Sequence, residues 1–303
     1  MISKTSDGQP VTVFIIAGEE SGDLLGAELM RALRARYGSV RFLGVGGDRM
    51  AEQGLSSMFP MRDIVLHGLA EVLVRAPNLF RRIRQTTDSI VAADPAVLVL
   101  VDCPGFNLRV GKAVRTRLPN LPIVDYVSPS VWAWAPWRAR RMARFVNHLL
   151  AILPFEPEVH RNLGGPPTTF IGHPLIERLP TLRPAAGERP ALGEGRPVLL
   201  VLPGSRHSEI RRLLDRFGET VARVNAAIGP IEVLLPAVDA YADEISERTK
   251  SWAVKPTIVR GEAAKYAAFR RAQVALAASG TVTLELALAK VPMVVAYRVD
   301  IFL

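Results

Sequence analysis

Short, uninterrupted apolar segments alternate with amphipathic segments along almost the whole chain. Typical apolar segments are residues 11–17 (VTVFIIA), 97–101 (VLVLV) and 198–202 (VLLVL), which are followed by Gly, Asp and Pro. Strands that are apolar throughout bury both of their faces, as in parallel sheets that are covered by helices on both sides. We therefore predict an α/β fold that is built on parallel sheets.

One break in this alternation divides the chain. Residues 176–196 are rich in Pro, Gly and charged side chains, a composition that predicts an interdomain linker. A chain of 303 residues is long enough for two cores. We predict a first doubly wound domain over residues 1–175 and a second over residues 197–303, with ligands bound in the cleft between them.

The net charge of +9 favours an anionic partner, which could be nucleic acid, a phosphorylated substrate or an acidic lipid surface. A single cysteine, Cys103, excludes an internal disulfide framework and fits a reducing cytosol. The apolar stretch from Val11 to Ala17 is short for a signal peptide, and no stretch approaches the ~20 apolar residues of a membrane span. Any membrane contact is therefore expected to be peripheral.

The segment AGEESGDLLG, residues 17–26, lies at a predicted strand-to-helix junction. Its glycines allow another backbone or a ligand to approach closely. Its acidic side chains would repel a pyrophosphate and suit sugar hydroxyls or a cationic partner. In the structural alternative, Ser21 caps the helix and Asp23 favours its positive end. The residues alone leave both interpretations open.

Asp102 directly follows the apolar segment 97–101, at the carboxyl end of a predicted strand. Open α/β sheets place their ligand-binding groups at this edge. A carboxylate there can act as a general base toward a hydroxyl, which is the role that we predict. The alternative is a turn aspartate that caps the following helix.

Two further strand-to-helix junctions, in LPGSRHSEI and ASGTVTLEL, contain glycine and hydroxyl residues. Backbone N–H groups at helix starts bind anions, and an arginine adds positive charge. We predict that the two junctions together bind a nucleotide diphosphate and that Glu285 reaches a ribose diol. Alternatively, these residues are ordinary helix caps and Glu285 belongs to a capping pair. The residues concerned are Gly204, Ser205 and Arg206 at the first junction and Ser279, Gly280 and Thr281 at the second.

Metal-binding patterns such as D-x-D, H-x-x-x-H and C-x-x-C do not occur in the sequence. We therefore predict neither a metal site nor a cofactor. Among the histidines, His173 ends a predicted strand and could donate to a phosphate. We interpret His160 as a surface or packing residue.

The segment SVWAWAPWRARR, residues 130–141, contains three of the four tryptophans, Trp132, Trp134 and Trp137, followed by Arg138. Indoles at a lipid interface, next to arginines that face anionic head groups, form a sensible pair. Base stacking combined with phosphate contacts would use the same residues. Packing of the tryptophans in a core is the third interpretation. The pattern by itself does not separate lipid from nucleic acid.

In motif content and order, the chain resembles the lipid-A-disaccharide synthase family. The resemblance extends from about Val11 to Arg298 and rests on AGEESGDLLGAEL, GVGGDRM, DCPGFN, YVSPSVWAW, LPFEPEVH, FIGHPL, LPGSRHSEI and ASGTVTLELALAKVPMVVAYR. It implies a GT-B glycosyltransferase with two Rossmann-like domains. Such enzymes transfer 2,3-diacylglucosamine from its UDP carrier to 2,3-diacylglucosamine 1-phosphate, with inversion and release of UDP.

The resemblance also implies partners and a location. It favours lipid over nucleic acid, with an acylated UDP-sugar donor, an acylated sugar phosphate acceptor and an anionic membrane surface as partners. It implies a peripheral position at the cytoplasmic face of the inner membrane, and it allows a homodimer.

The same resemblance suggests roles for individual residues. Asp102 matches the essential aspartate of the family segment D-x-P-D-F-N, and Arg206 matches the arginine of P-G-S-R. Glu285 matches the glutamate after S-G-T, which commonly holds the ribose in GT-B enzymes. The acceptor and lipid side is expected to comprise Ser21 and Asp23, from the segment A-G-E-x-S-G-D, together with Trp132, Trp134, Trp137 and Arg138.

Two features depart from the family pattern. Gly105 replaces the second aspartate of D-x-P-D-F, which argues against a role shared by two carboxylates. Family members continue beyond Arg298 by about a third of a domain, so we expect an incomplete second domain and reduced activity. Two alternatives therefore stay open. One is another UDP-sugar GT-B protein, such as a peptidoglycan glycosyltransferase or a sugar epimerase, and the other is a catalytically dead lipid-binding remnant.

Overall fold

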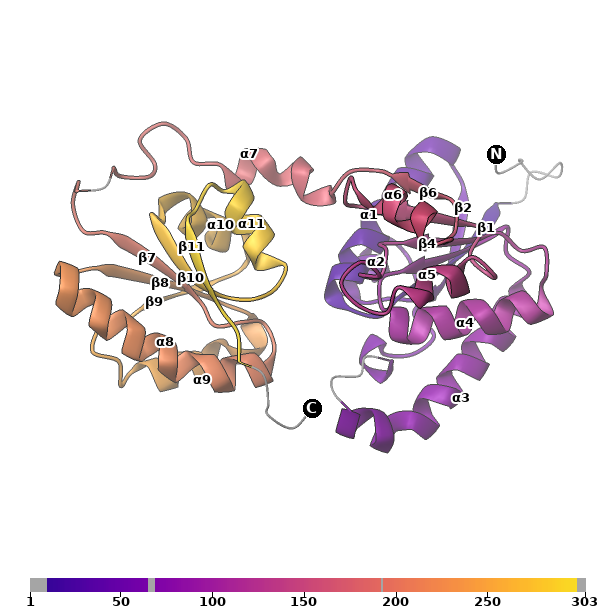
Figure 1. The fold of residues 1–303 in the computed structure, drawn as a ribbon, viewed down its shortest axis with the longest axis horizontal. Helices are drawn as coiled ribbons and strands as arrows, with labels where there is room; N and C mark the ends of the chain where they lie inside the picture. Colours follow the sequence, from indigo (N-terminus) through magenta and orange to yellow (C-terminus); the bar gives the residue numbers. More distant parts are fainter. Residues whose placement is uncertain (1–9, 65–68, 192, 299–303) are drawn as a thin grey trace. The chain divides into compact units, whose positions relative to one another are not determined.

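The computed structural model describes residues 10–64, 69–191 and 193–298, without the side chains of residues 69–75. The chain divides into two compact units, with the boundary between Pro174 and Leu175. Each unit is a parallel sheet with helices on both faces (Figure 1). The predicted α/β fold with two Rossmann-like sheets is therefore confirmed.

The first unit contains a six-stranded parallel sheet in the order β2-β1-β3-β4-β5-β6. Side chains alternate along its central strands, so that in β1 Phe14 and Ile16 enter one core while Val13 and Ile15 enter the other. The strands are β1 (Val11–Ala17), β2 (Val40–Val45), β3 (Val97–Val101), β4 (Ile123–Tyr126), β5 (His148–Ala151) and β6 (Thr168–Phe170). The helices are α1 (Glu20–Tyr37), α2 (Asp48–Glu52), η1 (Met61–Asp63), α3 (Leu69–Ala93), α4 (Pro104–Arg117), α5 (Trp137–Met142) and α6 (Glu156–Asn162).

Gly44 on β2 marks a close approach between two backbones. Its φ is 143°, and a Cβ atom there would lie 1.8 Å from the carbonyl oxygen of Ile15 on β1. Only glycine fits this position without moving the strand.

The second unit contains a five-stranded parallel sheet in the order β11-β10-β7-β8-β9. Helices α8 and α9 cover one face of this sheet, and α10 and α11 cover the other (Figure 1). The strands are β7 (Val198–Leu202), β8 (Glu232–Ala237), β9 (Thr257–Arg260), β10 (Val274–Ala278) and β11 (Met293–Ala296). The helices are η2 (Pro174–Arg178), α7 (Leu179–Leu182), α8 (His207–Ile228), η3 (Asp239–Tyr241), α9 (Ala242–Thr249), α10 (Glu262–Arg271) and α11 (Val282–Leu288).

The segment that we expected to be a linker packs against the second unit. Leu182 on α7 is fully buried in the core that contains Phe269. The guanidinium of Arg189 donates to backbone carbonyls that include those of Phe269 and Ala289, at 3.0 and 2.9 Å. A coil that is rich in Pro and Gly is thus held in place by hydrogen bonds to the ends of helices, which its composition does not reveal.

Among the described residues, no helix is both long enough and apolar enough to cross a membrane.

Candidate active site

A cavity of about 230 Å³ lies at the carboxyl ends of β3 and β4 in the first unit. Its lining includes Asp102, Ser128 and Ser130, which follow these strands, and Trp134 and Arg138 from the tryptophan-rich segment. Parallel sheets of this type bind ligands at this edge. The structure therefore brings together Asp102, Trp134 and Arg138, which are distant in the sequence.

Asp102 lies in a tight turn between β3 and α4. Its φ is 52° and that of Cys103 is 48°, and the side-chain amide of Asn107 donates to the carbonyls of Val101 and Asp102 at 3.1 and 2.7 Å. The Ser21 hydroxyl on α1 donates to Asp102 Oδ2 at 3.2 Å. Asp102 does not cap α4, because the N-cap residue is Cys103. Its partly exposed carboxylate can instead accept a proton from a hydroxyl in the cavity.

Backbone strain surrounds the same cavity. Val127, which lines it, has a φ of 78°, a genuine outlier for a β-branched residue. Ala135, between Trp134 and Pro136, has a φ of 58°. Such conformations cost on the order of 1–3 kcal/mol each and cluster at functional sites. The strain supports the cavity as the functional site of this unit.

Sequence reasoning missed Asp125, a carboxyl group inside β4. The residue is buried, and its pKa lies well above the usual value because burial removes water and because the charge of Asp102 is near. A carboxylate in the otherwise apolar segment IVDYV was the available signal.

Sequence reasoning also missed the buried pair of Ser128 and His160. The Ser128 hydroxyl lies 2.7 Å from Nε2 of His160, whose side chain is completely buried. Burial lowers the pKa of this imidazole, which favours its neutral form. His160 is therefore a packing residue, as expected, but one that holds a residue of the cavity wall.

The tryptophans of the segment 130–141 lie at the surface. Trp134 is 59% exposed and Trp137 is 56% exposed, so the interpretation that they pack in a core is wrong. The guanidinium of Arg138 stacks on the Trp134 ring, 4.0 Å from the ring centroid. Trp132 is 38% exposed and meets the ring of Phe155 edge to face, at a centroid distance of 5.1 Å. The tryptophan that is buried is Trp252, in the second unit.

Asp23 is buried in the first unit and is not among the residues that line this cavity. Its buried carboxylate accepts hydrogen bonds from the backbone N–H groups of Gly47, Arg49 and Met50, at 2.7, 3.0 and 3.2 Å. These groups belong to the N-terminal turn of α2, where a negative charge is stabilised. Its neighbour Ser21 forms no cap of α1 and instead bonds to Asp102.

The junction between β7 and α8 contains Gly204, Ser205 and Arg206, as predicted, with Arg206 as the N-cap. The Glu209 carboxylate accepts hydrogen bonds from the backbone N–H groups of Ser205 and Arg206, at 3.2 and 3.3 Å. It also pairs with the Arg206 guanidinium at 3.2 Å. Glu209, in the first turn of α8, therefore caps the helix through the donors that the sequence predicted for a phosphate, in agreement with the alternative interpretation of these residues as a helix cap.

The junction between β10 and α11 is exposed at Ser279, Gly280 and Thr281. The Ser279 N–H donates to the carbonyl of Ala296 on β11 at 3.2 Å, so it is used within the sheet. A Cβ atom at Gly280 would meet no other atom within 4 Å, which leaves room for a ligand. Glu285 does not form the capping pair of the structural alternative, because its carboxylate bonds to Lys265.

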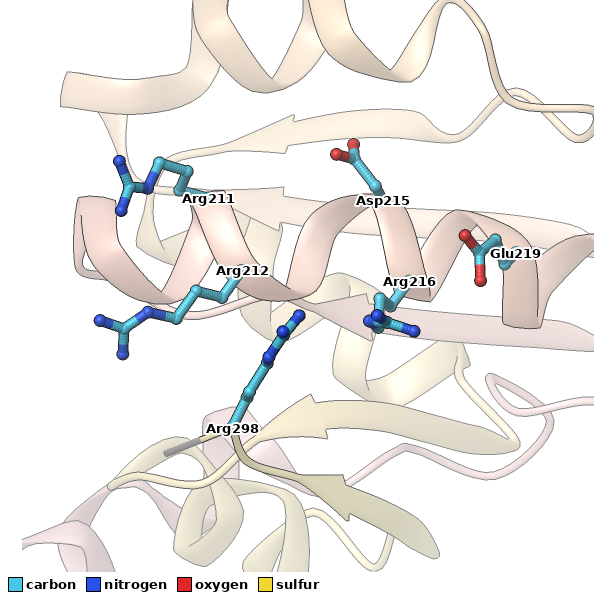
Figure 2. Close-up of a pocket in the computed structure, with 6 residues that line it drawn as sticks. All are labelled: Arg211, Arg212, Asp215, Arg216, Glu219 and Arg298. Atoms are coloured by element: carbon cyan, nitrogen blue, oxygen red, sulfur yellow. The ribbon is translucent and has the colours of Figure 1, made fainter. Parts of the chain in front are cut away.

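A cavity of about 390 Å³ in the second unit was not predicted from the sequence. Figure 2 shows Arg298, which follows β11, extending toward Arg212 and Arg216 on α8. The complete lining is Arg211, Arg212, Asp215, Arg216, Glu219 and Arg298. The lining thus combines four guanidinium groups with two carboxylates.

The remaining groups are less informative. His173, which could donate to a phosphate, is half-buried, and burial lowers its pKa. Gly105 is exposed and has open space around it. Within the part of the chain that the structure describes, no three His, Cys, Asp or Glu side chains are grouped so that they could hold a metal ion.

Solved structures of UDP-sugar enzymes have a similar fold. The UDP-GlcNAc 2-epimerase of Neisseria meningitidis, bound to UDP-GlcNAc, matches with a TM-score of 0.62, covering 95% of this chain and 82% of that chain. The Methanocaldococcus jannaschii enzyme of the same name, in complex with UDP-GlcNAc and UDP, matches with a TM-score of 0.59 over 95% and 83%. Their sequence identities of 10% and 13% establish the shared fold alone.

The sequence relatives are much closer. A family model described as lipid-A-disaccharide synthetase matches residues 13–303. The lipid-A-disaccharide synthase of Nitrobacter winogradskyi is 55% identical over 287 residues, which cover 94% of this chain and 72% of the relative. That of Rhodospirillum centenum is 47% identical over 296 residues, which cover 96% and 73%. The chain therefore belongs to the lipid-A-disaccharide synthase family of glycosyltransferases.

Proposed function

We propose that Asp102 is the general base of a transfer between two acylated sugars, UDP-2,3-diacylglucosamine and 2,3-diacylglucosamine 1-phosphate. Asp102 takes the proton of the acceptor 6-hydroxyl, and the acceptor oxygen attacks the anomeric carbon of the donor. The bond from that carbon to the UDP oxygen breaks, UDP leaves with the electron pair, and the configuration inverts. The observation that supports this role most directly is the position of the Asp102 carboxylate in the wall of the cavity. Its Oδ2 accepts a hydrogen bond from Ser21, and its Oδ1 can accept the proton of the acceptor hydroxyl.

The substrate assignment is tested by measuring UDP release with both acylated substrates. We expect release to require both of them. Release with unacylated UDP-N-acetylglucosamine alone would instead support another UDP-sugar glycosyltransferase. Binding of the lipid substrates without any release would support the alternative of an inactive lipid-binding protein.

The second unit is proposed as the UDP site. Arg206 and the backbone N–H groups of the β7–α8 junction would take the diphosphate in place of the Glu209 carboxylate, which already uses these donors. The exposed junction at Gly280 and Thr281 would supply further donors, and Glu285 would bind the ribose. The structural neighbours from Neisseria meningitidis and Methanocaldococcus jannaschii contain bound UDP-GlcNAc, the latter also UDP, which supports a nucleotide site in this fold.

A chelator should leave the activity intact. In the proposed site, guanidinium and N–H donors stabilise the charge of the departing UDP, a role that a divalent cation serves in other transferases. The measurement is the rate of UDP release in excess EDTA, with and without added Mg²⁺. Strong inhibition by EDTA that Mg²⁺ reverses would contradict the scheme.

The surface around Trp134 and Trp137 is proposed as a docking site for an anionic membrane at the cytoplasmic face. Both rings are more than half exposed, and Arg140, Arg141 and Arg144 nearby are exposed as well. Indoles suit the interfacial zone because the ring is apolar while its N–H seeks a partner. Each arginine adds roughly 1 kcal/mol near an acidic surface, and salt weakens this attraction.

Replacing both Trp134 and Trp137 by alanine should weaken binding to anionic liposomes more than tenfold. The loss corresponds to on the order of 100 Å² of apolar contact, which is worth about 2.5 kcal/mol. The melting temperature should stay unchanged because both rings are exposed. Liposome sedimentation at two salt concentrations, together with a thermal melt, measures both quantities.

The buried Trp252 provides the control for this experiment. Its replacement by alanine should destabilise the fold by about 3–5 kcal/mol. If the double variant kept its liposome binding, the membrane role of these tryptophans would be refuted.

A further inference from the structure

Glu285 lies in a charged cluster that joins α10 to α11. Its carboxylate accepts hydrogen bonds from the Lys265 ammonium on both oxygens, at 3.0 Å to Oε1 and 2.8 Å to Oε2. The Tyr266 hydroxyl lies 3.3 Å from Oε1. The side chain of Glu285 is 11% exposed and that of Lys265 is 29% exposed, so this ion pair is mostly shielded from water. Solvent and salt therefore screen this pair less than a typical surface ion pair.

Tyr266 has a defined direction as a donor. Its pKa rises to about 12, first because it is buried and then because the charge of Glu285 is near, so its hydroxyl keeps the proton. The Arg178 guanidinium, from η2, donates to this hydroxyl at 2.6 Å and to Glu262 at 2.7 Å. Because Tyr266 accepts from Arg178, its own proton points to Glu285. The network thus holds the Oε1 atom of the Glu285 carboxylate in place.

The network leaves a limited capacity on this carboxylate. An ionised carboxylate has about four lone-pair sites, and two from Lys265 and one from Tyr266 are used here. The remaining site, on Oε2, can therefore accept a hydrogen bond from a ribose hydroxyl while Lys265 keeps both of its bonds. Lys265 therefore determines the orientation in which the Glu285 carboxylate can bind a ribose diol.

We propose that Lys265 is a positioning residue, which orients the Glu285 carboxylate toward the ribose hydroxyls of the UDP donor. This inference rests on the proposed role of Glu285 in the UDP site. Without the ammonium, the carboxylate would lose both of its bonds to Lys265 and could rotate away from the position that a diol needs. A purely structural ion pair would affect the stability of the second unit but would not distinguish one nucleotide from another.

The test compares the affinity for UDP with that for 2′,3′-dideoxy-UDP, measured by calorimetry on the whole chain. The wild type should prefer UDP by roughly 10- to 100-fold, because a hydrogen bond to a charged group is lost with the hydroxyls. Lys265→Met should reduce this preference to less than about threefold while the affinity for dideoxy-UDP stays the same, and Lys265→Arg should restore most of it. Lys255→Met, at an exposed lysine of the same unit, is the matched control and should behave as the wild type.

The outcomes separate this proposal from the proposed function. If Lys265→Met kept the full preference for UDP, Lys265 would not position Glu285, and the UDP site would stand. If the wild type bound both nucleotides equally, or bound neither, the ribose role of Glu285 would fail and the role of Lys265 with it. If Lys265→Met does not fold, Lys265→Gln takes its place, because the neutral and shorter amide cannot reproduce the two charged bonds to Glu285. An unchanged preference for UDP in Lys265→Gln would then overturn the proposal.

Discussion

Replacing Asp102 by asparagine should lower turnover by roughly 10²–10⁴-fold while the affinity for UDP stays near that of the wild type. The amide has the size of the carboxylate and can still accept a hydrogen bond from Ser21, but it cannot take a proton from the acceptor hydroxyl. The loss should therefore fall on kcat. Initial rates of UDP release with both acylated substrates at saturation, with calorimetry for UDP, measure the two effects.

Ser21→Ala is the matched control, because it removes the hydrogen bond to Asp102 Oδ2 and leaves the base in place. We expect a loss of about fivefold, the value of one net hydrogen bond of about 1 kcal/mol. Unchanged turnover in Asp102→Asn would remove this residue from the mechanism. A parallel loss of UDP affinity would instead make Asp102 a binding residue.

Replacing Asp23 by alanine should lower the free energy of unfolding by about 2–4 kcal/mol. The change leaves the buried backbone N–H groups of Gly47, Arg49 and Met50 without their acceptor. It also removes a negative charge from the N-terminal end of α2. Urea denaturation followed by circular dichroism gives the change directly.

Glu52→Ala is the control. It removes an exposed carboxylate from α2 and should change the free energy of unfolding by less than about 0.5 kcal/mol. Asp23→Asn should fall between the two because its amide oxygen can still accept. The resemblance to the family suggested that Asp23 contacts the acceptor. That role would be supported, and the structural one refuted, if Asp23→Ala lost turnover at unchanged stability.

Local patterns in the sequence were sufficient to predict the fold. Continuous apolar segments predicted strands that are buried on both faces, and β3 and β7 are buried along their whole length. The same patterns put Asp102 and the residues around Gly204 and Gly280 directly after strands. Because the strands of a parallel sheet end at one edge, such residues become candidates for a site without any knowledge of the tertiary structure.

Local patterns did not predict how the polar side chains are paired. Asp23, interpreted as a group near the acceptor, bonds to a backbone segment that begins 24 residues later. The predicted phosphate donors at Ser205 and Arg206 are held by Glu209, and the predicted ribose ligand Glu285 is held by Lys265. The exposure of Trp134 and Trp137 was also undecided, because an indole suits a core as well as an interface.

The sequence by itself determined the two parallel sheets and the places along the chain where functional groups occur. Only the tertiary structure decided which partner each group meets. The physical reason is the range of the interactions: hydrophobic periodicity is a property of neighbouring residues, whereas a buried charge is satisfied by whichever donors the packing brings to it. Arg298 is an example. It follows β11 and lines a cavity together with arginines of α8 only because β11, β10 and β7 are neighbours in the second sheet.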